Sequence, residues 1–363
     1  MLITNVSAND ASLSCKSALL MDYASGTVLY KMNPHEKMPL ASVTKIMTLL
    51  LVMEEIDKGN IKYDDVITAS AYAKSMGGST IFLDEGEQMT LDDLIKGIAV
   101  SSGNDACVAV AEYISGNVES FVSRMNERAY ELNMTNTHFV NCNGLDAENH
   151  YSTAYDIALM SRELMKHEDI FRYTTIWMDS LRNGEFQLSN TNKLVRFYEG
   201  CTGLKTGSTS KAGFCISATA KRENLHLISV IMNAPTSKQR QADASTLLNY
   251  GFNTFASQKA VKKDSSVGDI KVIKGVKSFV KVKYKDDIDV LYEKNSSSKP
   301  EISTKFSSEL KAPLKAGDVV GEAVCYLNGS EMGKTDIIVS ENIEKINVLF
   351  AFREIFDIWI GNK

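Results

Sequence analysis

Apolar and polar positions follow different periods along the chain, and the changes of period divide it into segments. Residues 16–32 hold two apolar runs around a turn at Ser25-Gly26, which predicts a β-hairpin. Amphipathic stretches with polar starts and glycine stops follow, such as "TKIMTLLLVMEEIDKG" with its final Gly59. Helices are predicted over 44–59, 90–100 and 105–116.

From Phe214 onward the β-rich runs return. "FCISATA" and "LHLISVIM" are separated by the polar "KRENLH", as in a second hairpin, and the helical pattern "RQADASTLLNYGF" follows. This order predicts a sheet flanked by helices, with a helical subdomain between the strand segments, in the α+β or α/β class. The domain would span residues 15–258, after a tail at 1–14.

A third pattern begins near residue 259. In "SFVKVKYK", Val280 and Val282 alternate with Lys281 and Lys283, as in a strand with one buried and one solvated face. Turn-rich breaks separate further short strands, so a small all-β domain is predicted over 259–341.

Residues 342–363 return to helical spacing, with Val348, Phe352, Ile355 and Trp359 on one side. Such a stripe is typical of a helix that packs on its own protein. Its terminal place and its aromatic residues point instead to an amphipathic helix that lies on a membrane surface. Its acidic and basic residues cancel, so membrane attachment would depend on apolar burial.

Composition describes a globular protein and excludes one class of partner. The chain has 363 residues, enough for two domains, of which 44% are hydrophobic and 23% charged. Forty Lys and Arg against 45 Asp and Glu give a net charge of −5, so no basic field favours nucleic acid. No apolar run reaches the roughly 18 residues of a membrane-spanning helix.

The sequence contains few motifs that would indicate export, metal binding or an organic cofactor. Val6-Ser7-Ala8 has the form of a signal-cleavage site, which fits either a mature exported protein or a cytoplasmic protein that never had a signal. The six cysteines form no C-x-x-C pair and the histidines no H-E-x-x-H, so we expect no metal and no organic cofactor. Apolar surroundings of Cys107 and Cys215 predict buried free thiols.

Three motifs place hydroxyl, amine and amide groups where chemistry could occur. Ser42 and Lys45 form S-x-x-K near the start of an apolar helix, where burial would disfavour the charged lysine and allow it to accept a proton. Ser102-Gly103-Asn104 precedes another apolar helix, and Lys205-Thr206-Gly207 lies at a predicted strand end. Each motif alone also fits a simpler role: a snorkelling lysine, a helix cap and a solvated turn.

In this chain order, S-x-x-K, S-x-N and K-T-G are the motifs of the serine penicillin-recognising enzymes. Over most of its length the chain resembles the low-molecular-weight penicillin-binding proteins that act as D-alanyl-D-alanine carboxypeptidases, as in "LASVTKIMT", "SGNDACVAVAEY" and "LKTGSTSKAG". The resemblance implies the serine β-lactamase-like transpeptidase fold with an antiparallel sheet. It also implies a small β domain and a C-terminal amphipathic anchor.

The resemblance further implies a mechanism. Ser42 would attack the carbonyl between two D-alanines of a peptidoglycan stem peptide, and Lys45 would accept its proton. Ser102 would relay that proton to the departing D-alanine, and Asn104 would orient Lys45. β-Lactam antibiotics would acylate the enzyme, which would act at the outer face of the cytoplasmic membrane.

Substrate binding is implied for a second group of residues. Lys205 would supply positive potential, and Thr206 would hydrogen-bond the terminal carboxylate, with Gly207 allowing close approach. The N–H groups of Ser42 and Ser208 would form the oxyanion hole. Arg240 would steer the carboxylate, or would be an ordinary solvated arginine at a helix start.

Three departures from the family pattern affect substrate preference. Ser208 stands where one branch has histidine, Thr191 stands where an N-R-N context has arginine, and Cys142-Asn143 stand where proline and histidine often precede G-L-D.

Two rival functions share these motifs. A class A β-lactamase needs a glutamate four residues before an asparagine, and no such pair lies between Asp105 and Lys205. A binding or sensor module of the same fold would acylate without turnover. A Ser-His-Asp hydrolase lacks support because no G-x-S-x-G occurs.

Overall fold

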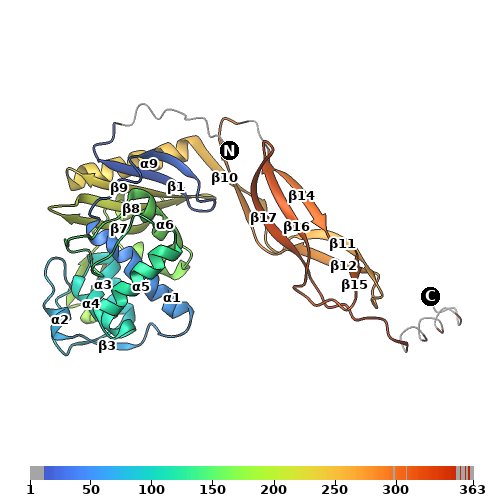
Figure 1. Ribbon diagram of the computed structural model, residues 1–363, viewed down its shortest axis with the longest axis horizontal. Helices are drawn as coiled ribbons and strands as arrows, with labels where there is room; N and C mark the ends of the chain where they lie inside the picture. Colours follow the sequence, from blue (N-terminus) through green and yellow to red (C-terminus); the bar gives the residue numbers. More distant parts are fainter. Residues whose placement is uncertain are drawn as a thin grey trace. The chain divides into compact units, whose positions relative to one another are not determined.

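The computed structural model describes residues 12–296, 299–307 and 309–348, and Phe352, Phe356 and Trp359 beyond them. These residues form two compact units that divide between Asn253 and Thr254 (Figure 1). The division lies a few residues before the predicted boundary at 258, because the strand Phe255–Val261 pairs with Ile288–Glu293 of the second unit.

The first unit is built on a five-stranded antiparallel sheet in the order β2-β1-β9-β8-β7. Both predicted hairpins are present, and β1 joins them because it pairs with β9, with Ala18 opposite Ile231. Strand β7 carries the K-T-G motif and lies at the sheet edge. The strands are β1 Ser17–Asp22, β2 Val28–Met32, β7 Cys201–Thr209, β8 Gly213–Arg222 and β9 Leu225–Ala234.

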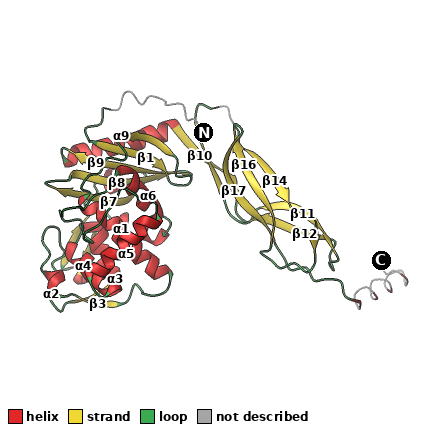
Figure 2. Cartoon of the chain, viewed as in Figure 1, coloured by secondary structure: helices red, strands yellow, loops and turns green. Residues whose placement is uncertain are grey.

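Helices cover both faces of this sheet (Figure 2). On one face α9 packs closely, since a Cβ on its Gly251 would lie 2.5 Å from Leu227 and 2.9 Å from Leu20. On the other face α6 contacts the sheet through the Ser161 and Ser217 hydroxyls, which lie 2.8 Å apart. The helices are α1 Lys45–Asp57, α2 Ala71–Lys74, α3 Leu91–Ser101, α4 Asn104–Ser115, α5 Val118–Glu131, α6 Ala154–Leu164, α7 Phe171–Thr174, α8 Leu194–Phe197 and α9 Ser237–Thr254.

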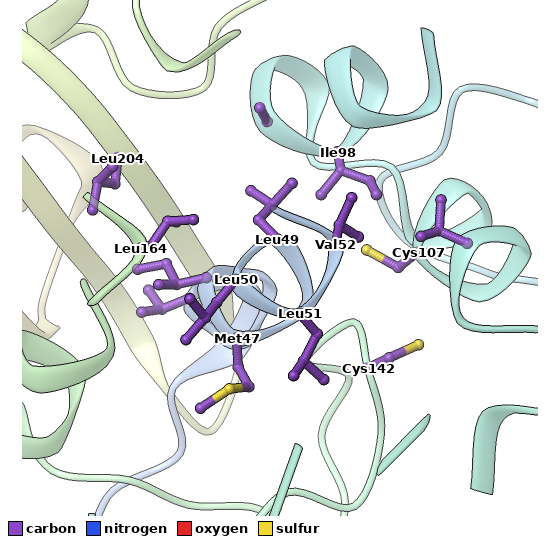
Figure 3. Packing of buried hydrophobic residues seen from close by; sticks show 14 of the residues in the cluster. Met47, Leu49, Leu50, Leu51, Val52, Ile98, Cys107, Cys142, Leu164 and Leu204 are labelled. Carbon is purple, nitrogen blue, oxygen red and sulfur yellow. The ribbon is translucent and has the colours of Figure 1, made fainter. Parts of the chain in front are cut away.

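Helix α1 forms the centre of the core. Its side chains Leu49, Leu50 and Val52 point away in different directions and are buried, as Figure 3 shows. A helix that is apolar on all sides must be enclosed on all sides, and neighbouring elements supply the enclosure. Contacts come from helices α3, α4, α5 and α6 and from strand β7. This enclosure fixes the start of α1, where the S-x-x-K motif lies.

Two small two-stranded sheets complete the first unit. Neither was predicted, because strands of three or four residues carry little periodic signal. They pair β3 Val66–Thr68 with β4 Gln88–Thr90, and β5 Met178–Leu181 with β6 Phe186–Ser189.

The second unit is all β among its described residues up to 347. A six-stranded sheet has the order β14-β16-β17-β12-β11-β15, and β10 pairs with β13. Val280 and Val282 are buried on β12 while Lys281 is exposed, so the predicted alternation is confirmed. The strands are β10 Phe255–Val261, β11 Ser266–Ile273, β12 Phe279–Tyr284, β13 Ile288–Glu293, β14 Glu301–Phe306, β15 Leu310–Lys311, β16 Val319–Leu327 and β17 Ser330–Val339.

The amphipathic helix predicted over 342–363 falls mostly outside the described residues. Within the part of the chain that the structure describes, none of the helices is long and apolar enough to cross a membrane.

Candidate active site

Ser42 lies in a 3₁₀ turn, Ala41–Thr44, that leads into α1. The α-helix therefore begins at Lys45, one residue after the start at Thr44 predicted from the sequence. In a 3₁₀ turn the side chains at i and i+3 eclipse, so Ser42 and Lys45 face the same side more directly than in an α-helix. The Lys45 Nζ and Ser42 Oγ atoms lie 3.0 Å apart.

Lys45 is fully buried and has three oxygen partners. Its Nζ lies 3.0 Å from Ser42 Oγ, 2.6 Å from Asn104 Oδ1 and 2.5 Å from the Asn143 carbonyl oxygen. The amide and carbonyl oxygens can only accept hydrogen bonds, whereas the serine hydroxyl can also donate. Lys45 Nζ donates to all three oxygens in this arrangement, and a neutral amine would keep the two bonds to Asn104 and Asn143 and accept the Ser42 proton with its lone pair.

Burial favours the neutral form of the Lys45 amine. Desolvation lowers the pKa of Lys45 below its usual value, and this effect is larger than the opposing influence of Cys107, Cys142 and Asp105. The predicted burial of Lys45 is confirmed, and desolvation favours the neutral form that a proton acceptor needs. A surface lysine that snorkels into solvent is excluded.

Ser102 and Asn104 lie where α3 ends and α4 begins. Ser102 ends α3 with a φ of 66°, and this left-handed turn lets α4 start within two residues. Asn104 is not a helix cap, because its Nδ2 donates to the Gly77 carbonyl at 2.7 Å and its Oδ1 faces Lys45. The helix-cap interpretation of this motif is therefore wrong for Asn104.

Two glycines allow strand β7 and a loop to pack closely against the turn that contains Ser42. A Cβ on Gly207 would lie 2.7 Å from the Ser42 nitrogen, so β7 packs directly on the turn. A Cβ on Gly144 would lie 2.0 Å from the Ala41 carbonyl oxygen, and Gly144 has a φ of 88°. The prediction that Gly207 allows close approach of another backbone is confirmed.

Lys205 is as buried as Lys45, and its pKa is well below the usual value. Burial is the main cause, and the positive charges of Lys45 and Arg240 add to it. Its Nζ donates to the Thr206 carbonyl oxygen at 3.1 Å. The site therefore gathers three basic groups in a space largely closed to water.

Arg240 is buried, which excludes the solvated arginine considered from the sequence. Its guanidinium donates to the Gly207 and Cys215 carbonyls, each at 3.3 Å, and to the Ser237 hydroxyl. Burial lowers its pKa to about 10. Its Nε has no hydrogen-bond partner among the described residues.

No described carboxylate forms an ion pair with Lys45, Lys205 or Arg240. Asp105 is the acid that most influences Lys45, and its oxygens accept the N–H groups of Ile81 and Leu83. The backbone thus satisfies that negative charge, and Lys205 and Arg240 stay without a carboxylate partner among the described residues.

Thr206 and Ser208 differ in their surroundings. Thr206 is buried and its hydroxyl lies 2.8 Å from that of Thr191, whereas Ser208 is exposed at the end of β7. Thr191 was noted in the sequence only as a departure, and the structure places it directly beside the K-T-G motif. The Asn143 carbonyl was missed, because every residue has one and side-chain patterns carry no information about it.

The cysteines are free thiols, as the sequence predicts. All six cysteines are unpaired, and five are buried. The described residues contain no group of three His, Cys, Asp or Glu side chains arranged to hold a metal ion.

Comparison with known proteins shows which family the chain belongs to. Residues 4–236 match the model of the D-alanyl-D-alanine carboxypeptidase family, and residues 255–345 match the C-terminal domain of penicillin-binding protein 5. The chain belongs to the D-alanyl-D-alanine carboxypeptidase family. The family and enzyme class predicted from the sequence are confirmed, and the β-lactamase and binding-module alternatives are not favoured.

Similar proteins span nearly the whole carboxypeptidase chain. D-alanyl-D-alanine carboxypeptidase DacF of Bacillus subtilis (strain 168) is 40% identical, over 95% of this chain and 90% of its own length. DacC of Escherichia coli (strain K12) is 34% identical, over 96% and 91%.

Solved structures confirm the predicted penicillin-binding fold. Penicillin-binding protein 5 from Haemophilus influenzae has a TM-score of 0.75 and 32% identity, over 92% of this chain and 98% of its own. Penicillin-Binding Protein D2 from Listeria monocytogenes, in a cefotaxime-bound form, has a TM-score of 0.61 and 30% identity, over 66% and 98%. Both penicillin-binding proteins therefore share their fold with this chain, the first over nearly all of it and the second over about two thirds.

Proposed function

We propose that this chain removes the terminal D-alanine from peptidoglycan stem peptides through an acyl-enzyme on Ser42. The observation that carries the proposal is the Lys45 amine, which is buried, aligned on Ser42 Oγ and held by two oxygens that can only accept hydrogen bonds. Such an amine is a base for the serine hydroxyl and leaves the nucleophile oriented in the ground state.

Acylation then runs in two proton transfers. The Ser42 hydroxyl proton passes to Lys45 Nζ while Oγ bonds to the carbonyl carbon between the two D-alanines. The C–N bond breaks, and the leaving amino group takes the proton from Lys45 through the Ser102 hydroxyl. Asn104 holds Lys45 in place through its Oδ1, which the Gly77 contact aims at the amine. Water then cleaves the ester and restores the Ser42 hydroxyl.

The substrate carboxylate would bind among the basic groups. Lys205 and Arg240 are buried without a carboxylate partner, and Thr206 presents its hydroxyl beside them, shared with Thr191. Strand β7 is a sheet edge, so an extended peptide can add along it. The N–H groups of Ser42 and Ser208 would stabilise the oxyanion.

β-Lactams would acylate the same serine. Relatives from Listeria monocytogenes have been solved in cefotaxime- and ampicillin-bound forms. Between Asp105 and Lys205 the chain has no glutamate with an asparagine four residues on, so the acyl-enzyme would hydrolyse slowly. We therefore expect stable penicillin acylation and little nitrocefin turnover.

The test of this function uses two peptides that differ in one charge. An N-acylated peptide ending in Lys-D-Ala-D-Ala should release free D-alanine, whereas the same peptide with a C-terminal amide should react at least about tenfold more slowly, because it lacks the carboxylate for the basic groups. A chromatographic assay measures D-alanine and D-alaninamide. Release of neither product from a folded chain would refute the proposed function, and equal rates would refute the carboxylate site.

We also propose an envelope location, at the outer face of the cytoplasmic membrane, because the substrate of such an enzyme lies there. Residues 342–363 would attach it to the lipid surface. The exposed side chains of Val348, Phe352, Phe356 and Trp359 support this assignment.

Membrane attachment has a direct test. The full chain should sediment with neutral phosphatidylcholine vesicles, and a chain ending at residue 342 should stay in solution. The effect should persist in high salt, since the acidic and basic residues of the segment cancel. Equal partitioning of the two chains would end the anchor proposal.

A further inference from the structure

The mechanism above leaves His150 without a role, although this histidine touches two parts of the site. It precedes α6, and its side chain is buried. Its Nε2 lies 2.8 Å from the hydroxyl of Thr44, in the turn that holds Ser42. Its Nδ1 accepts the N–H of Val140 at 2.9 Å, at the start of the loop that leads to Asn143.

These partners define one state of the imidazole. The Val140 N–H can only donate, so Nδ1 carries a lone pair. The Thr44 hydroxyl donates to the Ala41 carbonyl at 2.8 Å, so it accepts from His150 Nε2–H. His150 is therefore neutral, with its proton on Nε2, and lies in a chain of hydrogen bonds that ends on Ala41.

Each end of this chain supports a catalytic group. Ala41 has a φ of 50°, a costly backbone conformation for a residue with a side chain, and it directly precedes Ser42. On the other side, the segment after Val140 carries the Asn143 carbonyl that holds Lys45. Gly144 of that segment packs against the Ala41 carbonyl so closely that a Cβ would clash with it.

We propose that His150 is a positioning residue, which joins the nucleophile turn to the loop that orients Lys45 and so fixes the distance between Ser42 Oγ and Lys45 Nζ. The inference rests on the proposed acylation chemistry and adds a residue to it. His150 itself touches neither the serine nor the lysine in any hydrogen bond among the described residues.

Protonation would break this link. A second N–H on the ring would face the Val140 N–H, two donors in one contact. Burial lowers the pKa of His150 to about 4, with His138 lowering it further and Asp146 opposing the shift. The neutral link is thus complete above the ordinary histidine pKa and is lost as the pH falls through about 4.

The test compares three variants in acylation by a fluorescent penicillin. His150→Ala should acylate about 10- to 100-fold more slowly than wild type, because small displacements of catalytic groups have effects of this size. His150→Gln, whose amide offers one donor and one acceptor, should recover most of the rate. Equal losses in both variants, or no loss in His150→Ala, would overturn the proposal.

His226→Gln is the matched control. His226 is also buried, has a pKa lowered to about 4 by burial and bonds a threonine hydroxyl, that of Thr202. The acylation rate of wild type divided by that of His150→Gln should fall as the pH drops from 6.5 to about 4, because only wild type has the titrating His150. The acylation rate of wild type divided by that of His226→Gln should stay constant over the same range. Taking ratios removes the titration of Lys45. Parallel behaviour of the two ratios would contradict a specific role of His150.

A second readout does not depend on activity. Exchange of the Val140 amide proton should be slow in wild type and His150→Gln, and faster in His150→Ala. If the Val140 amide proton exchanged as slowly in His150→Ala as in wild type, the proposed link through His150 would be overturned. A wild-type chain that neither releases D-alanine nor acylates, with this exchange pattern intact, would refute the proposed function and leave the link standing.

Discussion

Ser42→Ala should abolish D-alanine release and penicillin acylation together, with a loss of at least about 10⁴-fold in the rate of each. The variant keeps Lys45 and its contacts to Asn104 and Asn143, so the site stays assembled while the atom that bonds to the carbonyl is gone. Release is measured by D-alanine assay, and acylation by the mass gain of the intact chain.

The control for this substitution comes from the chain itself. Ser278 also stands three residues before a lysine, Lys281, but lies in the all-β second unit. Ser278→Ala should leave both rates within about twofold of wild type, since substitutions of exposed residues outside the catalytic unit rarely have large effects. Substantial release by Ser42→Ala, with thermal unfolding like wild type, would place the nucleophile elsewhere.

The parts of the site that are side chains close in sequence could be predicted. The S-x-x-K spacing predicts that the serine and the lysine share one face, because three residues correspond to about one helical turn. The apolar residues around the motif predict that the lysine is buried. A strand beside Lys205 was also predicted, but K-T-G was expected at its end, whereas Lys205 lies inside β7 Cys201–Thr209. Its meeting with Ser42 was not encoded locally, because it depends on the pairing of β1 with β9 and on the order of the sheet.

The supporting backbone could not be predicted in the same way. The carbonyl of Asn143 lies 2.5 Å from Lys45 Nζ, yet any residue at this position would supply a carbonyl. The 3₁₀ turn of Ala41 was missed because "LASVTKIMT" is equally compatible with an α-helix at the level of pattern. Tertiary contacts from Gly144 and Gly207 select the tighter turn.

Lys45→Arg should be almost as damaging as loss of the serine, although it keeps the positive charge. Guanidinium cannot be deprotonated in a protein, so it cannot accept the Ser42 proton, and the five N–H donors do not fit a cavity shaped for one amine. Both D-alanine release and penicillin acylation should fall by about 10²–10⁴-fold, the range of general-base catalysis. Lys58→Arg, directly after the same helix in an exposed position, is the matched control and should change neither rate.

The pH profile separates a lost base from a disturbed fold. In wild type, acylation should increase with pH through the lowered pKa of Lys45, since the neutral amine is the form that accepts the proton and it prevails above that pKa. Lys45→Met removes the titrating group without adding bulk or charge. Its residual acylation should lack this rise, after correction for the folded fraction. If the acylation rate of Lys45→Met still increased with pH as in wild type, the titrating group, and therefore the base, would be another residue. Lys205 is the next candidate, because it is the other buried lysine of the site and its pKa is also lowered.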